Sequence, residues 1–453
     1  MNIMKNLILT ILTCATLYSC MGCSDSNAPE VEPTPSPSPE EGNYTASDMV
    51  VYEVNPRIFG IENAFKAVEA NLDHIKSLGT TVLWLMPVND PGVKNSVQSP
   101  YCIRDYKGLN PQYGILADLK SLVNAAHAKG MKVILDWVAN HTSWDHIWTV
   151  EHPEWFTQKN GNFTPPAEFP EWGDVIDLNF DSQEMQAAMI EAMEYWVKET
   201  GIDGYRCDYA EGVPVSFWKK ATDALRALDE DVILLAEAGK AEVLTEGGFD
   251  MLYAWGFQDK LEQLYAGKAT VEDLFNTYKE EKVGMPEGSI RMRYSTNHDQ
   301  ARDDSPLDCF NGERGAMSAF VIATMLDGIP LVYSSQEAAY PEALNFFNYE
   351  VVDVKANAAY CKEMTNVISA YKNTKDVRGG ELKLYSTGDV ASFYRNAGEH
   401  GMLVMVNPTN EAVQVKMPME QAGTTMKDMM TGESVKLPSA VTMQPYQYVI
   451  YKK

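Results

Sequence analysis

Residues 204–209 read GYRCDY and residues 232–238 read VILLAEA, and each of these short stretches carries an acidic residue close to its end. Both have the β-branched, aromatic or small residues of buried parallel strands. Six further stretches share this texture, at residues 50–54, 81–88, 132–138, 249–255, 290–297 and 329–334. Amphipathic helical patterns fill most of the gaps between them. Eight strand-then-helix units in succession predict an α/β fold, a (β/α)8 or TIM barrel, over residues 48–379.

Two segments depart from the strand-then-helix alternation. Residues 141–181, between the third and fourth predicted strands, contain WFTQKNGNFTPPAEFPEWGD, an aromatic stretch rich in proline and glycine. Its composition favours an inserted lobe beside the mouth of the barrel. After Gly379 and Gly380, short runs with a two-residue alternation take over. They predict a C-terminal antiparallel β-sandwich domain over residues 380–453.

The first 47 residues have the composition of a targeting segment followed by a spacer. Lys5 precedes an apolar run of about a dozen residues, which is too short to span a bilayer and is typical of a signal peptide. The run ends in Leu-Tyr-Ser-Cys, which resembles a bacterial lipobox with Cys20 as the lipidated residue. Cys23 is a second candidate. Five prolines between residues 29 and 39 predict a stiff, extended spacer.

These features predict a signal peptide at residues 1–19, a lipidated Cys20 or Cys23, and a Pro-rich linker at residues 20–47. The expected location is a lipid anchor in the bacterial outer membrane, at the cell surface or on the periplasmic face. An ordinary secretory signal, in which the two cysteines have no function, is the alternative.

The net charge of the chain disfavours two kinds of partner. With 63 acidic and 37 basic residues, the formal charge is −26 at pH 7, which would repel the phosphates of nucleic acid. The same charge disfavours an acidic polysaccharide as a substrate. A neutral ligand fits such a surface better.

Polar side chains gather at the ends of the predicted strands, where the active site of a TIM barrel lies. The third strand ends in Asp136 and leads into Asn140 and His141, the fourth carries Arg206 and Asp208, the fifth ends in Glu237, and the seventh ends in Asn297, His298 and Asp299. Acids, an arginine and histidines from four strands are therefore expected to converge on one rim.

Two of these acids are expected to differ in protonation. Arg206 and Asp208 lie two residues apart, so they project to the same side of a strand, and the guanidinium favours the anionic form of Asp208 near neutral pH. Glu237 follows a wholly apolar run, which should raise its pKa. One anionic and one protonated carboxylate on adjacent strands are the groups of a retaining glycosidase. A structural ion-pair network in the barrel mouth is the alternative interpretation.

The order of the motifs resembles the α-amylase superfamily, glycoside hydrolase family 13, over residues 48–453. The matching segments are NLDHIKSLGTTVLWLMPV (71–88), DWVANH (136–141), VIDLN (175–179), GYRCDYA (204–210), LLAEA (234–238), TNHD (296–299) and GIPLVYSSQE (328–337). The resemblance implies a catalytic triad in which Asp208 is the nucleophile, Glu237 the general acid and then base, and Asp299 a stabiliser of the transition state. The residues that it implies for substrate binding are Tyr101, His141, Arg206, His298 and Arg302.

The sequence departs from the family pattern after the nucleophile. A Lys-His pair is common there, on the leaving-group side and at a calcium site, but this chain has Glu211 and Gly212. Asn140 and Asp177 match two other calcium positions of the family, and both are oxygen donors that suit the ion. The resemblance therefore leaves calcium binding open. Tyr209 is also unlike the usual residue of an α-1,4 endo-amylase, which leaves the linkage preference open.

These motifs predict a retaining α-glucan hydrolase that cleaves starch or maltooligosaccharides through a covalent glycosyl-enzyme. An exo-acting α-glucosidase or a transglycosylase would use the same groups, since only access of the acceptor differs. A non-catalytic glycan-binding lipoprotein is a further alternative, although all three carboxylates are present. The expected partners are an α-glucan, the membrane through the N-terminal lipid, and components of a glycan-uptake complex; nucleic acid and organic cofactors are not expected.

Overall fold

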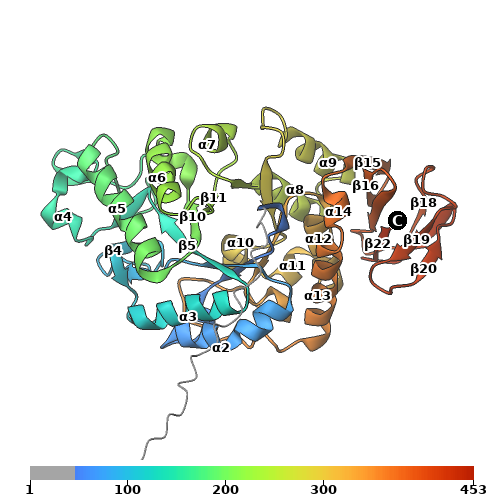
Figure 1. The fold of residues 1–453 in the computed structure, drawn as a ribbon, viewed down its shortest axis with the longest axis horizontal. Helices are drawn as coiled ribbons and strands as arrows, with labels where there is room; N and C mark the ends of the chain where they lie inside the picture. Colours follow the sequence, from blue (N-terminus) through green and yellow to red (C-terminus); the bar gives the residue numbers. More distant parts are fainter. Residues whose placement is uncertain (1–45) are drawn as a thin grey trace, which may run out of the picture. The chain divides into compact units, whose positions relative to one another are not determined.

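The structure, a computed structural model, describes residues 46–453. The predicted signal peptide, almost all of the predicted linker, and both Cys20 and Cys23 lie outside the described residues. The eight predicted strands form one closed parallel barrel in the order β1-β14-β13-β12-β11-β10-β5-β2. They are β1 (Val51–Val54), β2 (Val82–Leu85), β5 (Lys132–Val138), β10 (Gly204–Asp208), β11 (Ile233–Ala236), β12 (Met251–Tyr253), β13 (Ile290–Arg293) and β14 (Ile329–Tyr333). Figure 1 labels β5, β10 and β11 among them. The predicted TIM barrel is confirmed.

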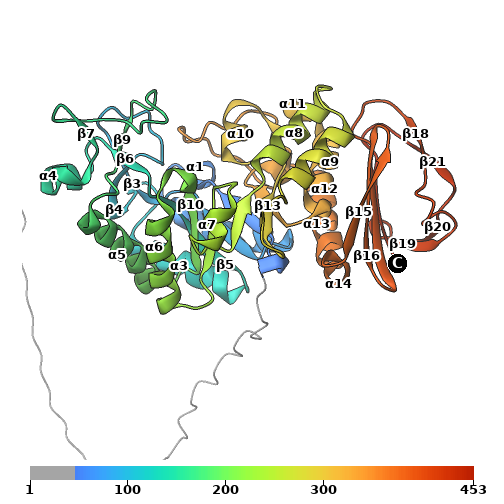
Figure 2. The same cartoon turned by 90° about the horizontal axis from the view of Figure 1, so that it is seen from above.

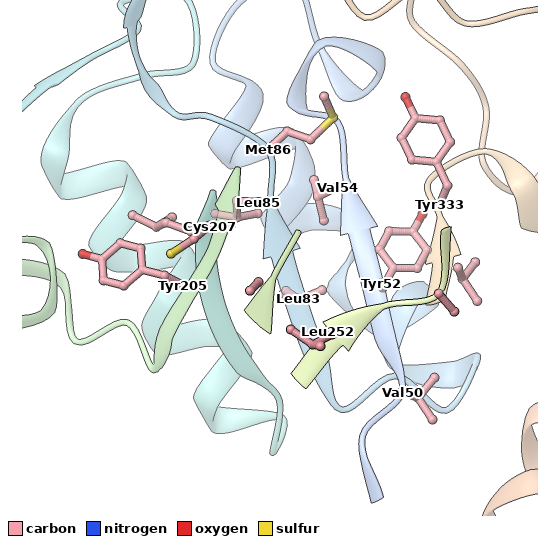
Figure 3. Packing of buried hydrophobic residues seen from close by; sticks show 14 of the residues in the cluster. Val50, Tyr52, Val54, Leu83, Leu85, Met86, Tyr205, Cys207, Leu252 and Tyr333 are labelled. Atoms are coloured by element: carbon pink, nitrogen blue, oxygen red, sulfur yellow. The ribbon is translucent and has the colours of Figure 1, made fainter. Parts of the chain in front are cut away.

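Successive side chains of a barrel strand point alternately outward, toward the helices, and inward, into the barrel. Both faces of each strand are therefore buried. Outward side chains pack against the helices, among them Tyr52, Leu83, Tyr205 and Cys207 (Figure 3). The inward side chains form a separate apolar cluster that fills the barrel. Its members on the strands are Val51, Val82, Trp84, Ile134, Ile233, Leu235, Met251, Tyr253, Met292, Ile329 and Leu331.

Helices cover the outside of the barrel, and their buried faces carry the apolar side chains that the sequence places at helical spacing. The helices after residue 50 and outside the inserted lobe are α1 (Pro56–Phe59), α2 (Ala64–Ser77), α3 (Leu116–Ala128), α5 (Gln183–Thr200), α6 (Val215–Leu228), α7 (Ala241–Thr245), α8 (Trp255–Tyr265), α9 (Val271–Glu280), α10 (His298–Asp303), α11 (Pro306–Cys309), α12 (Glu313–Leu326), α13 (Ala358–Lys372) and α14 (Lys375–Arg378). Among residues 46–453, none of the helices is both long and apolar enough to cross a bilayer.

Two excursions leave the barrel at the carboxyl ends of its strands. The predicted lobe contains β6 (His141–Ser143), α4 (Trp148–Glu151), β7 (Gln158–Lys159), β8 (Asn162–Phe163) and β9 (Val175–Asp177), and β6 pairs antiparallel with β9. A second excursion, which the sequence analysis did not predict, is the hairpin of β3 (Asn89–Pro91) and β4 (Ile103–Leu109). Figure 2 shows both excursions at the same end of the described region.

The C-terminal residues form antiparallel sheets, as predicted. A six-stranded sheet has the order β15-β16-β17-β22-β19-β20, and a two-stranded sheet joins β18 to β21. The bounds are β15 (Glu381–Thr387), β16 (Val390–Ala397), β17 (His400–Val406), β18 (Val413–Lys416), β19 (Thr425–Asp428), β20 (Ser434–Lys436), β21 (Ala440–Met443) and β22 (Tyr448–Lys452). Arg395 of β16 joins this domain to the barrel, because it donates to the Leu326 carbonyl at 2.8 Å and pairs with Asp327 at 2.8 Å.

The first residue of β10 must be glycine for the barrel to close next to the site. Gly204 has a φ of +150°, and a Cβ there would lie 1.9 Å from the carbonyl oxygen of Ile233 on β11. We therefore expect Gly204→Ala to lower the free energy of unfolding by roughly 3 kcal/mol or more, since neither backbone can move without breaking the ladder. Urea unfolding would measure it.

Gly201→Ala is the matched control for this prediction. Gly201 ends α5 in the left-handed region, with a φ of +70°, and nothing lies within 4 Å of an added Cβ. Its substitution should cost about 1 kcal/mol, for backbone strain alone. Equal losses in the two variants would contradict the steric role of Gly204.

Candidate active site

A cleft of about 490 Å³ opens where the barrel strands end. This volume is within the usual range for small-molecule sites. Most of the residues singled out in the sequence line it together: Tyr101, His141, Asp208, Glu237, His298, Asp299 and Arg302. They come from the β3–β4 excursion, the inserted lobe, β10, the end of β11, and α10.

The inward positions of several strands change from apolar to charged as the strands approach the cleft. Along β1, Val51 is followed two residues later by Glu53, and along β5, Ile134 is followed by Asp136. Arg206 occupies the corresponding inward position of β10, where it pairs in register with Asp136. Because side chains alternate along each strand, the inward positions near the carboxyl ends of these strands carry buried charges, whereas the inward positions before them are apolar.

Arg206 connects three carboxylates beneath the cleft and is itself fully buried. Its Nη1 lies 2.8 Å from Asp136 Oδ1 and 2.9 Å from Asp208 Oδ1, and its Nη2 lies 2.9 Å from Glu237 Oε2. Its Nε donates to the Tyr253 hydroxyl at 2.9 Å. A planar guanidinium has donors in a fixed arrangement, so Arg206 also fixes the positions of the carboxylates around it.

Asp208 and Glu237 sit side by side at the ends of adjacent strands. Cys207 pairs with Ala236, so the register brings Asp208 opposite Glu237 in the next position. The backbone N–H of Tyr209 donates to Glu237 Oε2 at 2.7 Å, which ties the acid to the neighbouring strand. Each carboxylate also has an oxygen 2.9 Å from the Arg206 guanidinium, so the two groups flank the same cation.

Both of these carboxyl groups have raised pKa values. Burial raises the pKa of Asp208 to about 6, with Arg206 opposing and Asp136 and Asp299 adding to the rise. Burial likewise raises the pKa of Glu237 to about 7, against the effect of Arg206. Arg206 thus acts in the predicted direction on Asp208, but burial and two neighbouring carboxylates outweigh it. The predicted order is kept, since Glu237 holds its proton to a higher pH than Asp208.

The sequence pattern predicted that His298 and Asp299 lie at the end of a strand, but the structure places them elsewhere. β13 ends at Arg293, and the two residues form the first turn of α10. Asn297 caps this helix, since its side-chain oxygen accepts from the N–H of Asp299 at 2.9 Å and of Gln300 at 3.3 Å. The polar residues after the strand favour a helix cap because they satisfy free backbone donors. The side chain of Asp299 is 34% exposed and faces the cleft, 3.4 Å from His298 Nε2.

The other predicted binding residues differ in how they meet the cleft. Tyr101 is buried, and its hydroxyl contacts both Asp136 Oδ2 at 3.1 Å and His298 Nε2 at 2.9 Å. Burial lowers the pKa of His141 to about 4, so this ring is neutral above that pH. Arg302 lines the cleft, and its guanidinium also forms an ion pair with Asp303 at 2.7 Å.

Tyr209, Glu211 and Gly212 form a local arrangement in place of the Lys-His pair. Tyr209 has a left-handed backbone with a φ of +38°, and its ring lies over Gly212, where a Cβ would be 2.1 Å from Tyr209 Cε1. The carboxylate of Glu211 accepts from the backbone N–H groups of Gly239 and Lys240. Glu211 therefore connects the loop after β10 to the loop after β11.

Asn140 and Asp177 are the two residues expected at a calcium site. His141, next to Asn140, pairs with Asp177 across β6 and β9, so the two donors are near one another. Ca²⁺ takes six to eight oxygens, which can include amide and backbone carbonyl oxygens. Among residues 46–453, no three His, Cys, Asp or Glu side chains are grouped to hold a metal ion. The Tyr209 ring leaves no room for a side chain at residue 212. Calcium binding stays a prediction.

Several residues in or beneath the cleft were missed in the sequence. Glu53 is a single acid within an apolar strand, a pattern that could have marked it as a buried charge. Phe169 and Trp172 stack at 4.0 Å and 7° in the inserted lobe, and Tyr209 meets Phe169 edge-on at 5.1 Å. These three rings form an aromatic wall of the cleft, and in the sequence only the general aromatic content of the lobe indicated it. The remaining lining includes Trp255, Phe346 and Phe347.

The raised pKa of Glu237 links stability to pH. Because the folded state binds this proton more tightly than the unfolded state, where a glutamate has a pKa of about 4.3, the wild type loses stability as pH rises from about 4 to about 7. Glu237→Gln lacks the ionisation, so we expect it to be more stable than the wild type at pH 8 by roughly 2–4 kcal/mol, with the difference nearly vanishing at about pH 4. Chemical denaturation at both pH values measures this.

Glu287→Gln is the control for that experiment, because Glu287 is exposed on the loop before β13. It should leave the stability unchanged at both pH values. A Glu237→Gln variant that is less stable than the wild type at pH 8 would show that the ion pair with Arg206 outweighs the cost of burying the charge.

The comparisons with known proteins agree with this geometry. Residues 60–172 and 169–427 match the family described as alpha amylase, catalytic domain. An alpha-amylase of Haloarcula japonica is 27% identical over 416 residues, which are 87% of this chain; the chain spans 60% of the length of that relative. Crystal structures of an alpha-amylase from Lactobacillus plantarum (27% identity, TM-score 0.82) and of a maltogenic alpha-amylase from Thermotoga neapolitana (26%, 0.81) each align with 90% of this chain and with 99% of their own. The chain therefore belongs to the alpha-amylase catalytic domain family.

Proposed function

We propose that this protein hydrolyses α-glucosidic bonds in starch or maltooligosaccharides, with retention of configuration, through a covalent glycosyl-enzyme. The observation that carries the proposal is the pair of Asp208 and Glu237, which lie on adjacent strand ends and share the Arg206 guanidinium beneath the cleft. Retaining glycosidases place their two carboxyl groups about 5–5.5 Å apart, and a single guanidinium in contact with both carboxylates requires them to lie close together. Family membership supports the same chemistry.

The pKa order assigns the two carboxyl groups. With a pKa of about 6, Asp208 is largely anionic at pH 7, and in the proposed first step it attacks the anomeric carbon to form the covalent bond. With a pKa of about 7, Glu237 is still partly protonated and donates its proton to the departing oxygen. In the second step Glu237 takes a proton from water, and the resulting hydroxyl displaces Asp208. Two displacements at one carbon restore the original anomer.

The surrounding residues would bind the sugar and stabilise the transition state. Asp299 reaches the cleft with a partly exposed carboxylate, suited to the secondary hydroxyls of a glucosyl unit and to the positive charge of an oxocarbenium-like state. His141 is neutral and lines the cleft, so its ring N–H can be offered to a sugar hydroxyl, while His298 lies beside Asp299. The ring of Tyr101 lines the cleft and offers an apolar face to a pyranose.

An exo-acting α-glucosidase or a transglycosylase would share every step up to the covalent intermediate. The aromatic wall of Phe169, Trp172 and Tyr209 lies beside the nucleophile, where a sugar could compete with water as the acceptor. Products from maltotriose separate the candidates, because a transglycosylase yields chains longer than the substrate and an exo-enzyme yields one short product throughout. A non-catalytic binding protein is not favoured, since all three carboxylates face the cleft.

We also propose that the catalytic domain is held at the bacterial outer membrane, at the cell surface or on the periplasmic face, by a lipid on Cys20 or Cys23. Support comes from the sequence alone, in the lipobox-like Leu-Tyr-Ser-Cys and the Pro-rich spacer that follows. An anchored hydrolase of this kind would act beside the components of a glycan-uptake complex, which would import its products.

Asp208→Asn tests the proposed function. The amide cannot form the glycosyl ester, so we expect the release of reducing ends from soluble starch to fall by about a thousandfold or more, with the fold intact by circular dichroism. Asp73→Asn is the control, since Asp73 is 89% exposed on α2. Retained activity in Asp208→Asn would refute the assignment. For the wild type, NMR of the first products should show the α-anomer.

The lipid anchor has its own test. Cys20→Ala should move the full-length protein from the membrane fraction to the soluble fraction of the cell, because a chain without its acyl groups has no other predicted attachment. If only Cys23→Ala has this effect, Cys23 is the lipidated residue. Membrane association that survives the double substitution would contradict lipid anchoring.

A further inference from the structure

His298 is held beneath the cleft with both ring nitrogens engaged. Nδ1 lies 2.5 Å from Glu53 Oε1, and Nε2 lies 2.9 Å from the Tyr101 hydroxyl. The ring stacks on Tyr101 at 5.3 Å and 19°, and it meets Trp84 and Phe346 edge-on. Neither Glu53 nor His298 is more than 2% exposed. The imidazole therefore has a fixed orientation, and its protonation depends on its partners.

The hydrogen-bond pattern favours a proton on each nitrogen. Arg206, Trp84 and Tyr101 all donate to Asp136, so this carboxylate accepts at both oxygens. The Tyr101 hydroxyl has a single proton, and once that proton is directed to Asp136, the oxygen must accept from His298 Nε2. On the other side, the carboxylate of Glu53 accepts from Nδ1–H.

Glu53 has His298 as its hydrogen-bond partner. Its second oxygen, Oε2, is buried and has no hydrogen-bond partner among the described residues. A buried carboxylate is costly unless a positive charge lies beside it. The Arg206 guanidinium contributes at longer range, but its near partners are other carboxylates. A protonated His298 supplies the missing charge at hydrogen-bond distance.

Charged and titratable groups from several elements surround this pair. Those that interact with His298 or Glu53 are Tyr101 after β3, Asp136 on β5, Arg206 and Asp208 on β10, Tyr253 on β12, Tyr294 after β13, Asp299 on α10 and Tyr333 on β14. Carboxylates outnumber cations in this set. Burial alone would lower the pKa of His298, but Asp299 and Glu53 outweigh it and raise the pKa to about 9.

We propose that Glu53 is a positioning residue that keeps His298 doubly protonated, so that a positive charge is held beside Asp299 in the cleft. Its effect on hydrolysis rests on the proposed function, whereas the charge of His298 does not. The short contact between Glu53 Oε1 and His298 Nδ1, the burial of both groups and the direction of the Tyr101 hydroxyl bond all favour this arrangement.

Histidine NMR tests the charge without reference to activity. In the full-length protein labelled on its seven histidines, the His298 signal is identified by its loss in His298→Gln. The wild-type ring should remain an imidazolium up to pH 8, and Glu53→Gln should bring its midpoint to below about 7, since the amide offers no negative charge. A wild-type His298 that is neutral at pH 7 would overturn the proposal.

Steady-state kinetics test the effect on hydrolysis. Because the variant and the wild type both contain Glu237, dividing one kcat/KM by the other removes the pH dependence that the titration of Glu237 contributes. The kcat/KM of Glu53→Gln relative to the wild type should be near one at pH 5 and should fall about tenfold by pH 8. A merely structural role would lower the ratio equally at every pH, and a constant ratio would therefore refute the effect on hydrolysis. If Glu53→Gln does not fold, Glu53→Asp, which keeps the charge but lengthens the contact, should show the same trend more weakly.

Glu337→Gln is the matched control. Glu337 is a second fully buried carboxylate, and it accepts from the hydroxyl of Tyr52, the residue that precedes Glu53 but faces the opposite side of β1. Its substitution removes an equally buried charge outside the cleft. The ratio of its kcat/KM to the wild type should not change with pH, and its His298 signal should titrate as in the wild type. A pH-dependent ratio in Glu337→Gln would show that any lost buried charge has this effect.

Discussion

The site depends on the burial of one guanidinium among carboxylates. Arg206 is fully buried in the barrel and touches Asp136, Asp208 and Glu237, while the rings of Trp84 and Tyr253 lie within 5.4 Å of its centre. Removing it would leave three carboxylates beside one another without a compensating charge, which is far more costly than the pair interactions suggest. The rings of Trp84 and Tyr253 and the fixed guanidinium geometry hold these acids in place at the base of the cleft.

The excess of negative charge explains why the acids have unusual pKa values. Five carboxylates (Glu53, Asp136, Asp208, Glu237 and Asp299) lie around two cationic side chains, Arg206 and His298. Burial disfavours every charge, and neighbouring carboxylates disfavour one another, so the pKa values of Asp208 and Glu237 rise into the neutral range. A proton donor near pH 7 is thus a property of the whole cluster rather than of the apolar strand before Glu237.

Loops outside the barrel shape the cleft around this cluster. The inserted lobe supplies the stacked pair of Phe169 and Trp172, and the β3–β4 excursion supplies Tyr101. Tyr209 accepts a left-handed backbone, which places its N–H on Glu237 and its ring against Gly212. Such strain is usual where a chain must turn sharply to present functional groups. Glu211 accepts from the backbone N–H groups of Gly239 and Lys240 and so joins the loop after β10 to the loop after β11.

The sequence by itself determined the barrel, because eight short buried strands alternating with amphipathic helices leave few other ways to bury their apolar faces. It also determined that Asp208 and Glu237 would meet at the mouth, since each lies at the end of one of two consecutive predicted strands. Only the tertiary structure decided that Asp299 stands on a capped helix turn, that Glu53 reaches His298, and that burial outweighs Arg206 in setting the pKa of Asp208. Those outcomes depend on contacts between residues far apart in the chain, such as Glu53 and His298, and on the local exclusion of water, neither of which a pattern of neighbouring residues encodes.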